Sequence, residues 1–154
     1  MIILEKTGQA AAALYALAAA AYPAGSPWTA AQFEADLKNP QTLYIAAVAD
    51  DGTLVAFLGC RYLFDEGEIT NLAVLPEYRR QRLGKRLLGA LFECLLQKEP
   101  QFTVFLEVRS SNLSAQKLYS GQGFEVIGRR KQYYQHPTED ALIMRRALPV
   151  EKKE

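Results

Sequence analysis

The stretch from Ile69 to Leu88 constrains the fold of this 154-residue chain more than any other. It begins with an apolar run typical of a buried strand, turns at Pro76, and continues into a helix whose leucines recur at helical spacing. Five cations fall within eight positions of the junction: Arg79, Arg80, Arg82, Lys85 and Arg86. The first N–H groups of a helix have no intrahelical partner, and the helix dipole adds partial positive charge there. The stretch therefore predicts a site for a phosphate-bearing ligand, a diphosphate rather than a carboxylate.

A solvated basic face is the alternative explanation for these five cations. However, cations at the start of a helix oppose the helix dipole, so the cluster is unfavourable there unless an anion binds. For this reason we favour the ligand site over the solvated face.

The composition is that of a soluble globular protein, with 49% hydrophobic and 23% charged residues. The length suits one domain, which we expect over residues 1–149, followed by a charged tail at 150–154. A formal net charge of +1 argues against a general nucleic-acid binder.

The alanine-rich segment 10–21 is too short to span a bilayer. Glu5 and Lys6 precede it where a secretory signal would carry a basic cluster, so we expect a cytoplasmic protein without membrane contact. Cys60 and Cys94 lie in apolar runs without metal-ligand spacing, which predicts small core residues. His136 is the only histidine and lies beside a proline, so we read it as a loop residue and expect neither a zinc site nor a His-based triad.

Periodicity and turn signals predict the element order β-α-α-β-β-β-α-β-α-β-β. Helices are expected over 10–21, after Thr29 in a Thr-x-x-Gln capping box, up to about Gln97, and after Asn112 as N-cap. Strands are expected over 2–4, 42–49, 54–64, from 69, and over 102–108, 124–127 and 141–148, with a basic, tyrosine-rich loop between the last two. The fold class is thus α+β, with a mostly antiparallel central sheet of about seven strands flanked by about four helices.

The segment Tyr78–Leu88 resembles motif A of the GNAT acyltransferases, Q/R-x-x-G-x-G/A, which wraps the pyrophosphate of acetyl-CoA. Arg79 and Gly84 fit the first and last positions, whereas Arg82 stands where the first glycine is expected. An arginine with positive φ would be strained, so we expect an ordinary negative φ at Arg82, with the guanidinium free to reach a phosphate.

Further segments resemble one branch of that family, the bacterial ribosomal-protein-alanine N-acetyltransferases. These segments are Leu106–Asn112, Leu118-Tyr119, Gly123-Phe124, Arg129–Tyr134 and Glu139–Met144. The resemblance implies the GNAT fold, in which the fourth and fifth strands part around the cofactor. It also implies acetyl transfer from acetyl-CoA to the N-terminal amine of a ribosomal protein, with no metal.

The resemblance also implies a set of cofactor contacts. Backbone N–H groups of Leu72, Ala73 and Val74 would bind the acetyl carbonyl and the pantetheine arm. The pyrophosphate would be bound by Arg80, Gln81, Arg82, Leu83, Gly84 and Lys85, and a further part of the cofactor by Asn112.

Glu107 is the candidate general base, acting directly or through a water. A carboxylate inside the apolar, β-forming run FTVFLEVR is unusual, although it could also be a solvent-facing residue paired with Arg109. Tyr119 is the candidate acid for the leaving thiolate, with core packing as the alternative. The resemblance decides both assignments, and the spacing only permits them.

Three other functions remain open. The enzyme could acetylate a small molecule or a lysine side chain. The chain could bind CoA without turnover, with Arg82 marking a degraded motif. A nucleic-acid module that uses the two basic clusters is disfavoured by the balanced charge.

Overall fold

The computed structural model describes residues 2–6 and 9–149. The elements in chain order are β1 (Ile2–Lys6), α1 (Ala11–Ala21), α2 (Ala30–Leu37), β2 (Thr42–Ala49), β3 (Leu54–Leu63), β4 (Glu66–Val74), the 3-10 helix η1 (Pro76–Tyr78), α3 (Leu83–Lys98), β5 (Phe102–Arg109), α4 (Leu113–Gly121), β6 (Glu125–Tyr134) and β7 (Glu139–Leu148). This order confirms the predicted α+β class, with seven strands and four α-helices in the described part of the chain. The expected tail at 150–154 lies outside the described residues.

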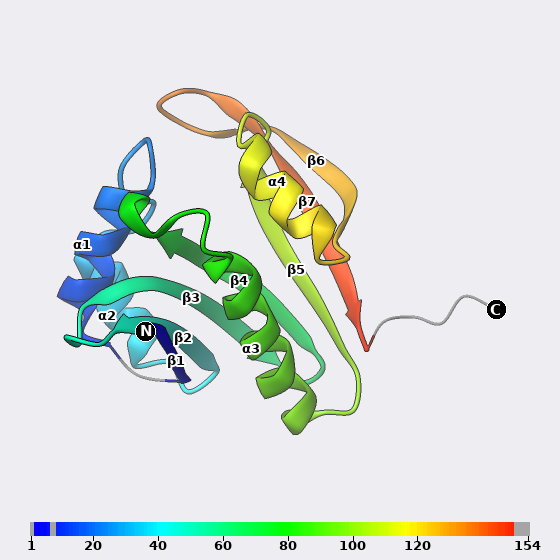
Figure 1. Ribbon diagram of the computed structural model, residues 1–154. Helices are drawn as coiled ribbons and strands as arrows, with labels where there is room; N and C mark the ends of the chain where they lie inside the picture. Colours follow the sequence, from blue (N-terminus) through cyan, green and yellow to red (C-terminus); the bar gives the residue numbers. More distant parts are fainter. Residues whose placement is uncertain (1, 7–8, 150–154) are drawn as a thin grey trace.

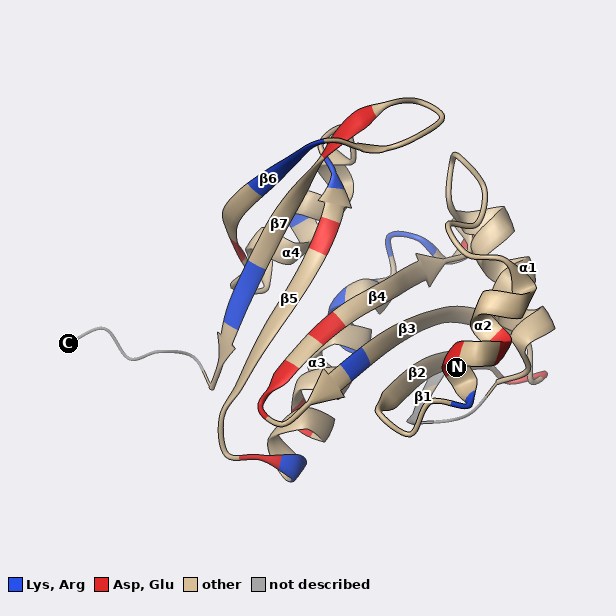
Figure 2. Ribbon diagram, turned by 180° about the vertical axis from the view of Figure 1, so that it is seen from behind, with Lys and Arg blue, Asp and Glu red and all other residues tan. Residues whose placement is uncertain are grey.

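The seven strands form one sheet in the order β1-β2-β3-β4-β5-β7-β6. Every pairing is antiparallel except that of β4 with β5, which is parallel and runs only from Glu66↔Thr103 to Ile69↔Leu106. Beyond these residues the two strands diverge, so the sheet opens into two arms (Figures 1 and 2). We call this divergence the β4–β5 fork.

Helices cover both faces of the sheet (Figure 1). Helix α3 buries a row of leucines against one face: Leu83, Leu87, Leu88, Leu91 and Leu95. Helices α1 and α2 pack on the opposite face, where Leu14 and Phe33 meet Phe57 and Ala73 of the sheet. The two cores explain why the strands carry apolar residues on both sides.

Local sequence signals form the expected caps. Thr29 and Gln32 make a complete capping box at the start of α2, and the Asn112 side chain accepts a hydrogen bond from Ala115 N–H at the start of α4. Gly52 adopts a φ of 85° in the turn that joins β2 to β3, a conformation open to glycine without steric cost.

One predicted loop is wrong. The basic, tyrosine-rich segment belongs to β6, which continues to Tyr134 and pairs with β7 through Arg129↔Leu142 and Tyr134↔Glu139. An irregularity between Arg130 and Tyr134 absorbs extra residues, which hid the strand periodicity. His136 lies in the following turn, as predicted. No described helix is long and apolar enough to cross a membrane.

Candidate active site

The basic turn lies past the end of β4 and leads into α3 (Figure 2, blue). Arg80 and Arg82 both adopt left-handed backbone, with φ of 66° and 59°. The predicted negative φ at Arg82 is therefore wrong: Arg82 is the N-cap residue of α3, and only four residues separate η1 from that helix. The chain keeps the conformation a glycine would adopt, at a cost of about 1–2 kcal/mol per arginine.

The start of α3 is suited to an anion. No side chain caps it, and its first turn carries no acidic residue, so its first N–H groups remain available. Two of the five cations are tied to backbone carbonyls: Arg79 donates to Ala21 O at 2.6 Å and Arg86 to Ile2 O at 3.4 Å. The side chains of the other three make no hydrogen bond or ion pair with the described part of the chain: Arg80, Arg82 and Lys85.

Gly84 lies at a close contact between helices. A Cβ built on Gly84 would lie 2.8 Å from Leu118 Cδ2 of α4, which is closer than Cβ atoms in folded proteins approach other heavy atoms. The glycine at the end of the motif therefore lets the start of α3 approach α4, which brings the basic turn and α4 to the same end of the fork.

Leu72, Ala73 and Val74 lie on β4 beyond its last pair with β5, where the cofactor contacts were predicted. However, the Leu72 backbone already has a partner, because its N–H donates to the Tyr22 hydroxyl at 3.0 Å and its carbonyl accepts from the same hydroxyl at 2.9 Å. Burial raises the pKa of Tyr22 to about 12, an effect that its hydrogen bond with Leu72 partly offsets. Tyr22 follows α1 directly and was missed, since nothing in the sequence connects that position to β4.

Glu107 extends from β5 on the face opposite α3, because its neighbours Leu106 and Val108 both belong to the α3 core. Its carboxylate pairs with Arg130 of β6, Nε to Oε1, at 3.0 Å and is 22% exposed. The alternative pairing with Arg109 is wrong, since Arg109 pairs with Glu139 at 3.4 Å. Sequence reasoning missed Arg130, which reaches Glu107 only because β6 continues as a strand.

Two tyrosines of β6 surround this carboxylate. The Glu107 charge is the main cause of the raised pKa of Tyr133, whereas the pKa of Tyr134 is raised to about 12 mainly by burial and then by Glu107. Arg130 lies over the Tyr133 ring at 5.4 Å and Arg109 over the Tyr134 ring at 4.3 Å. The face of the fork next to Glu107 thus combines one carboxylate, two guanidinium groups and two phenols.

Tyr119 of α4 is buried, 7% exposed, with its ring in edge contact with Phe124 at 5.6 Å. Burial, and then the neighbouring Tyr22 and Tyr134, raise the pKa of Tyr119 well above its usual range. The side chain therefore packs in the core and also lies within electrostatic reach of Tyr22 and Tyr134. Its hydroxyl stays protonated at neutral pH, as a proton donor must.

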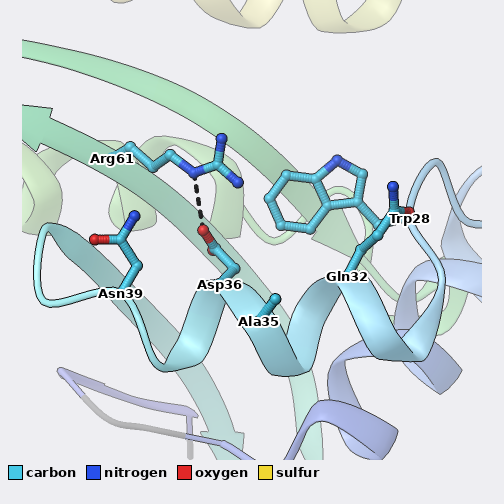
Figure 3. Close-up of a pocket in the computed structure, with 6 residues that line it drawn as sticks. All are labelled: Trp28, Gln32, Ala35, Asp36, Asn39 and Arg61. Carbon is cyan, nitrogen blue, oxygen red and sulfur yellow. Dashed lines mark hydrogen bonds and ion pairs between the residues drawn. The ribbon is translucent and has the colours of Figure 1, made fainter.

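A separate pocket of about 380 Å³ lies between α2 and β3 (Figure 3). Its lining residues are Trp28, Gln32, Ala35, Asp36, Asn39 and Arg61. None of the predicted site residues lines it, and its one buried charge is already satisfied, because Asp36 pairs with Arg61 Nε at 2.9 Å and accepts from Tyr44 at 2.6 Å and Thr42 at 3.2 Å. We therefore assign this pocket a structural role, in which Asp36 fastens α2 to the sheet.

Trp28 borders this pocket and packs its ring 5.2 Å from Phe33, with Arg61 over it at 5.2 Å. Trp28 therefore helps to anchor the start of α2 on the core of the α1–α2 face. Cys60 and Cys94 are free thiols, and burial is the main cause that raises the pKa of Cys60 to about 12. The described residues contain no group of three or more His, Cys, Asp or Glu that could hold a metal.

Residues 11–124 match the acetyltransferase (GNAT) family. The chain belongs to this family. It is 39% identical over 122 residues to a ribosomal protein bS18-alanine N-acetyltransferase of Haemophilus ducreyi, covering 77% of this chain and 81% of that protein. It is 36% identical over 124 residues to the N-alpha-acetyltransferase RimI of Mycobacterium tuberculosis, covering 78% and 75%.

A solved structure, the ribosomal-protein-S18-alanine N-acetyltransferase of Escherichia coli, superimposes with a TM-score of 0.87 at 30% identity and covers 100% of this chain and 97% of its own. The predicted GNAT resemblance and its ribosomal-alanine branch are thereby confirmed. This member of the GNAT family is an acetyl-CoA-dependent N-acetyltransferase.

Proposed function

We propose that this enzyme transfers the acetyl group of acetyl-CoA to the N-terminal amine of a ribosomal protein, with Glu107 as general base and Tyr119 as general acid. The observation that carries the proposal is the fork itself. It brings a protonated tyrosine, a carboxylate and a stretch of β4 that no longer pairs with β5 to the end of the sheet where the uncapped start of α3 carries three cations whose side chains have no partner in the described chain.

The cofactor contacts follow from this arrangement. The N–H groups at the start of α3, with Arg80, Arg82 and Lys85, would bind the pyrophosphate. Gln81, Leu83 and Gly84 would contribute backbone to the same turn. The pantetheine arm would run along β4, where the backbone of Leu72–Val74 has left its pairing with β5. The Oδ1 atom of Asn112 serves the α4 cap, so its amide NH₂ is the group that would contact the cofactor.

The chemistry requires two proton transfers. Glu107 would take a proton from the acceptor ammonium, and the neutral nitrogen would attack the thioester carbon. Backbone N–H groups of β4 would stabilise the oxyanion that forms. When the C–S bond breaks, the Tyr119 hydroxyl would give its proton to the departing CoA thiolate, and the amide nitrogen would lose its second proton to solvent.

The test combines acetyl-CoA with synthetic peptides that carry the N-terminal sequences of ribosomal proteins. Release of free CoA thiol measures turnover, and tandem mass spectrometry places the acetyl group. We expect acetylation at the peptide N-terminus. Turnover with small amines but with none of these peptides would overturn the proposed acceptor.

The left-handed Arg82 is the observation that would fit a degraded motif, since it is a strained arginine in place of glycine. The family to which the chain belongs is nevertheless one of acetyltransferases. Calorimetry with CoA, run beside the turnover assay, measures whether the arginine weakens cofactor binding.

A further inference from the structure

Within the described chain, three buried side-chain atoms lack a hydrogen-bond partner, and all three belong to two adjacent residues. They are Thr70 Oγ1, Asn71 Oδ1 and Asn71 Nδ2. Asn71 is only 2% exposed. Because nearly all buried polar groups in folded proteins are hydrogen-bonded, an entire amide and a hydroxyl left unsatisfied side by side point to a ligand that binds there.

These two residues form a β-bulge in β4. The pairing with β3 shifts from Cys60↔Ile69 to Gly59↔Asn71, so Thr70 is an extra residue on the β4 side. Thr70 Oγ1 lies 3.1 Å from the position of a Cβ built on Gly59, and Ala73, two residues beyond Asn71, packs in the α1–α2 core. The bulge therefore turns the side chains of Thr70 and Asn71 to the α1–α2 face of the sheet.

The bulge coincides with the apex of the fork. The last β4–β5 pair is Ile69↔Leu106, so Thr70 is the first residue of β4 beyond it and Glu107 is the first residue of β5 beyond it. Glu107 also points away from α3, since Leu106 and Val108 face that helix. An unsatisfied amide, an unsatisfied hydroxyl and the proposed general base are thus found on one face at the level where the strands separate.

We propose that Thr70 and Asn71 are positioning residues that hold a water molecule against Glu107, through which Glu107 takes the acceptor's proton. Asn71 offers an acceptor and donors beside a hydroxyl, and a buried water typically makes about three hydrogen bonds. The water gives one proton to the carboxylate and receives one from the acceptor ammonium, so it is regenerated unchanged. This inference rests on the proposed function, because it requires Glu107 to be the base.

The test starts with Asn71→Leu, which keeps the branched shape of the side chain and removes its polar atoms. We expect kcat to fall about 10- to 100-fold, a part of the roughly 10²–10⁴-fold effect of a general base, with acetyl-CoA affinity unchanged. The unfolding temperature of the cofactor-free variant should not fall, since leucine places apolar atoms of similar shape where the amide was. Unchanged kcat, or an effect on KM alone, would overturn the proposal.

Thr70→Val provides a second variant should Asn71→Leu fold poorly, and Thr70→Ser should restore turnover because it keeps the hydroxyl. Thr103→Val is the matched control: Thr103 pairs with Glu66 at the closed end of the same two strands, and its variant should keep full activity. Loss of activity in Thr103→Val equal to that in Thr70→Val would assign the effect to strand packing and refute a positioning role.

The double variant with Glu107→Gln separates this inference from the proposed function. If Asn71 acts through Glu107, Asn71→Leu should lower kcat no further in the Glu107→Gln background. If the two substitutions lower kcat independently, so that their fold-changes multiply, the water site is refuted and Glu107 remains the base. Full turnover by Glu107→Gln alone would refute the proposed base, and with it this inference.

Discussion

Tyr22→Phe is the substitution whose effect can be worked out most directly from the structure. The hydroxyl of Tyr22 makes two hydrogen bonds, to the N–H and the carbonyl of Leu72, at 3.0 and 2.9 Å. At about 1 kcal/mol each, their loss should lower the free energy of unfolding of the cofactor-free enzyme by about 1–2 kcal/mol. For a chain of this length, the melting temperature should fall by about 2–8 °C.

The effect on cofactor binding should have the opposite sign. If the acetyl carbonyl or the pantetheine arm binds Leu72 N–H, as proposed, it must first displace the Tyr22 hydroxyl. Removing that hydroxyl destabilises the cofactor-free form by about 1 kcal/mol, because Leu72 N–H loses its hydrogen-bond partner. The bound form does not lose this hydrogen bond, because there the cofactor accepts from Leu72 N–H. The affinity for acetyl-CoA should therefore rise about fivefold, and the difference in melting temperature between the variant and the parent enzyme should shrink at saturating cofactor.

Isothermal titration calorimetry and thermal denaturation with and without acetyl-CoA measure both effects. Tyr15→Phe in α1 is the matched control, because Tyr15 is 41% exposed and its side chain makes no hydrogen bond within the described chain. Unchanged or weaker cofactor affinity, together with an equal loss of stability with and without cofactor, would show that the cofactor does not use Leu72 N–H.

Four further outcomes are expected. Glu107→Gln should keep acetyl-CoA affinity and lower turnover by roughly 10²–10⁴-fold; unchanged turnover in rapid-mixing experiments where chemistry is rate-limiting would remove Glu107 from the mechanism. Arg82→Ala and Arg82→Gly should both weaken CoA binding in calorimetry, and the glycine variant should be more stable to denaturant by about 1 kcal/mol because it relieves the left-handed strain; the affinity of the parent enzyme in both variants would show that the guanidinium does not reach the phosphate. Asp36→Ala should lower the free energy of unfolding by about 2–3 kcal/mol and leave acetyl-CoA affinity intact, and a large affinity loss would connect the α2–β3 pocket to catalysis. At pH 7 a neutral α-amine costs about 1.1 kcal/mol and a neutral lysine about 4.6 kcal/mol, so tandem mass spectrometry of a lysine-containing peptide should find the acetyl group at the N-terminus; acetyl mainly on the lysine would indicate a stronger base than Glu107.

The sequence by itself determined the element order and predicted where the cofactor would bind. Apolar periodicity, the Thr29 capping box and the Asn112 cap are local signals, because each depends on residues within a few positions of one another. The basic turn before α3 could also be identified from the sequence, because unpaired N–H groups at a helix start and clustered cations are both local features.

Only the tertiary structure decided which residues surround the reacting groups. Arg130 reaches Glu107 across strands, and Tyr22 reaches Leu72 over 50 positions of sequence. The left-handed backbone at Arg82 has the same origin, because the geometry of the η1–α3 connection overrode the local preference of arginine for negative φ. Contacts between distant segments depend on how the whole sheet and its helices pack. The backbone of this turn depends on the positions of η1 and α3 at its two ends. No short-range pattern in the chain encodes either of them.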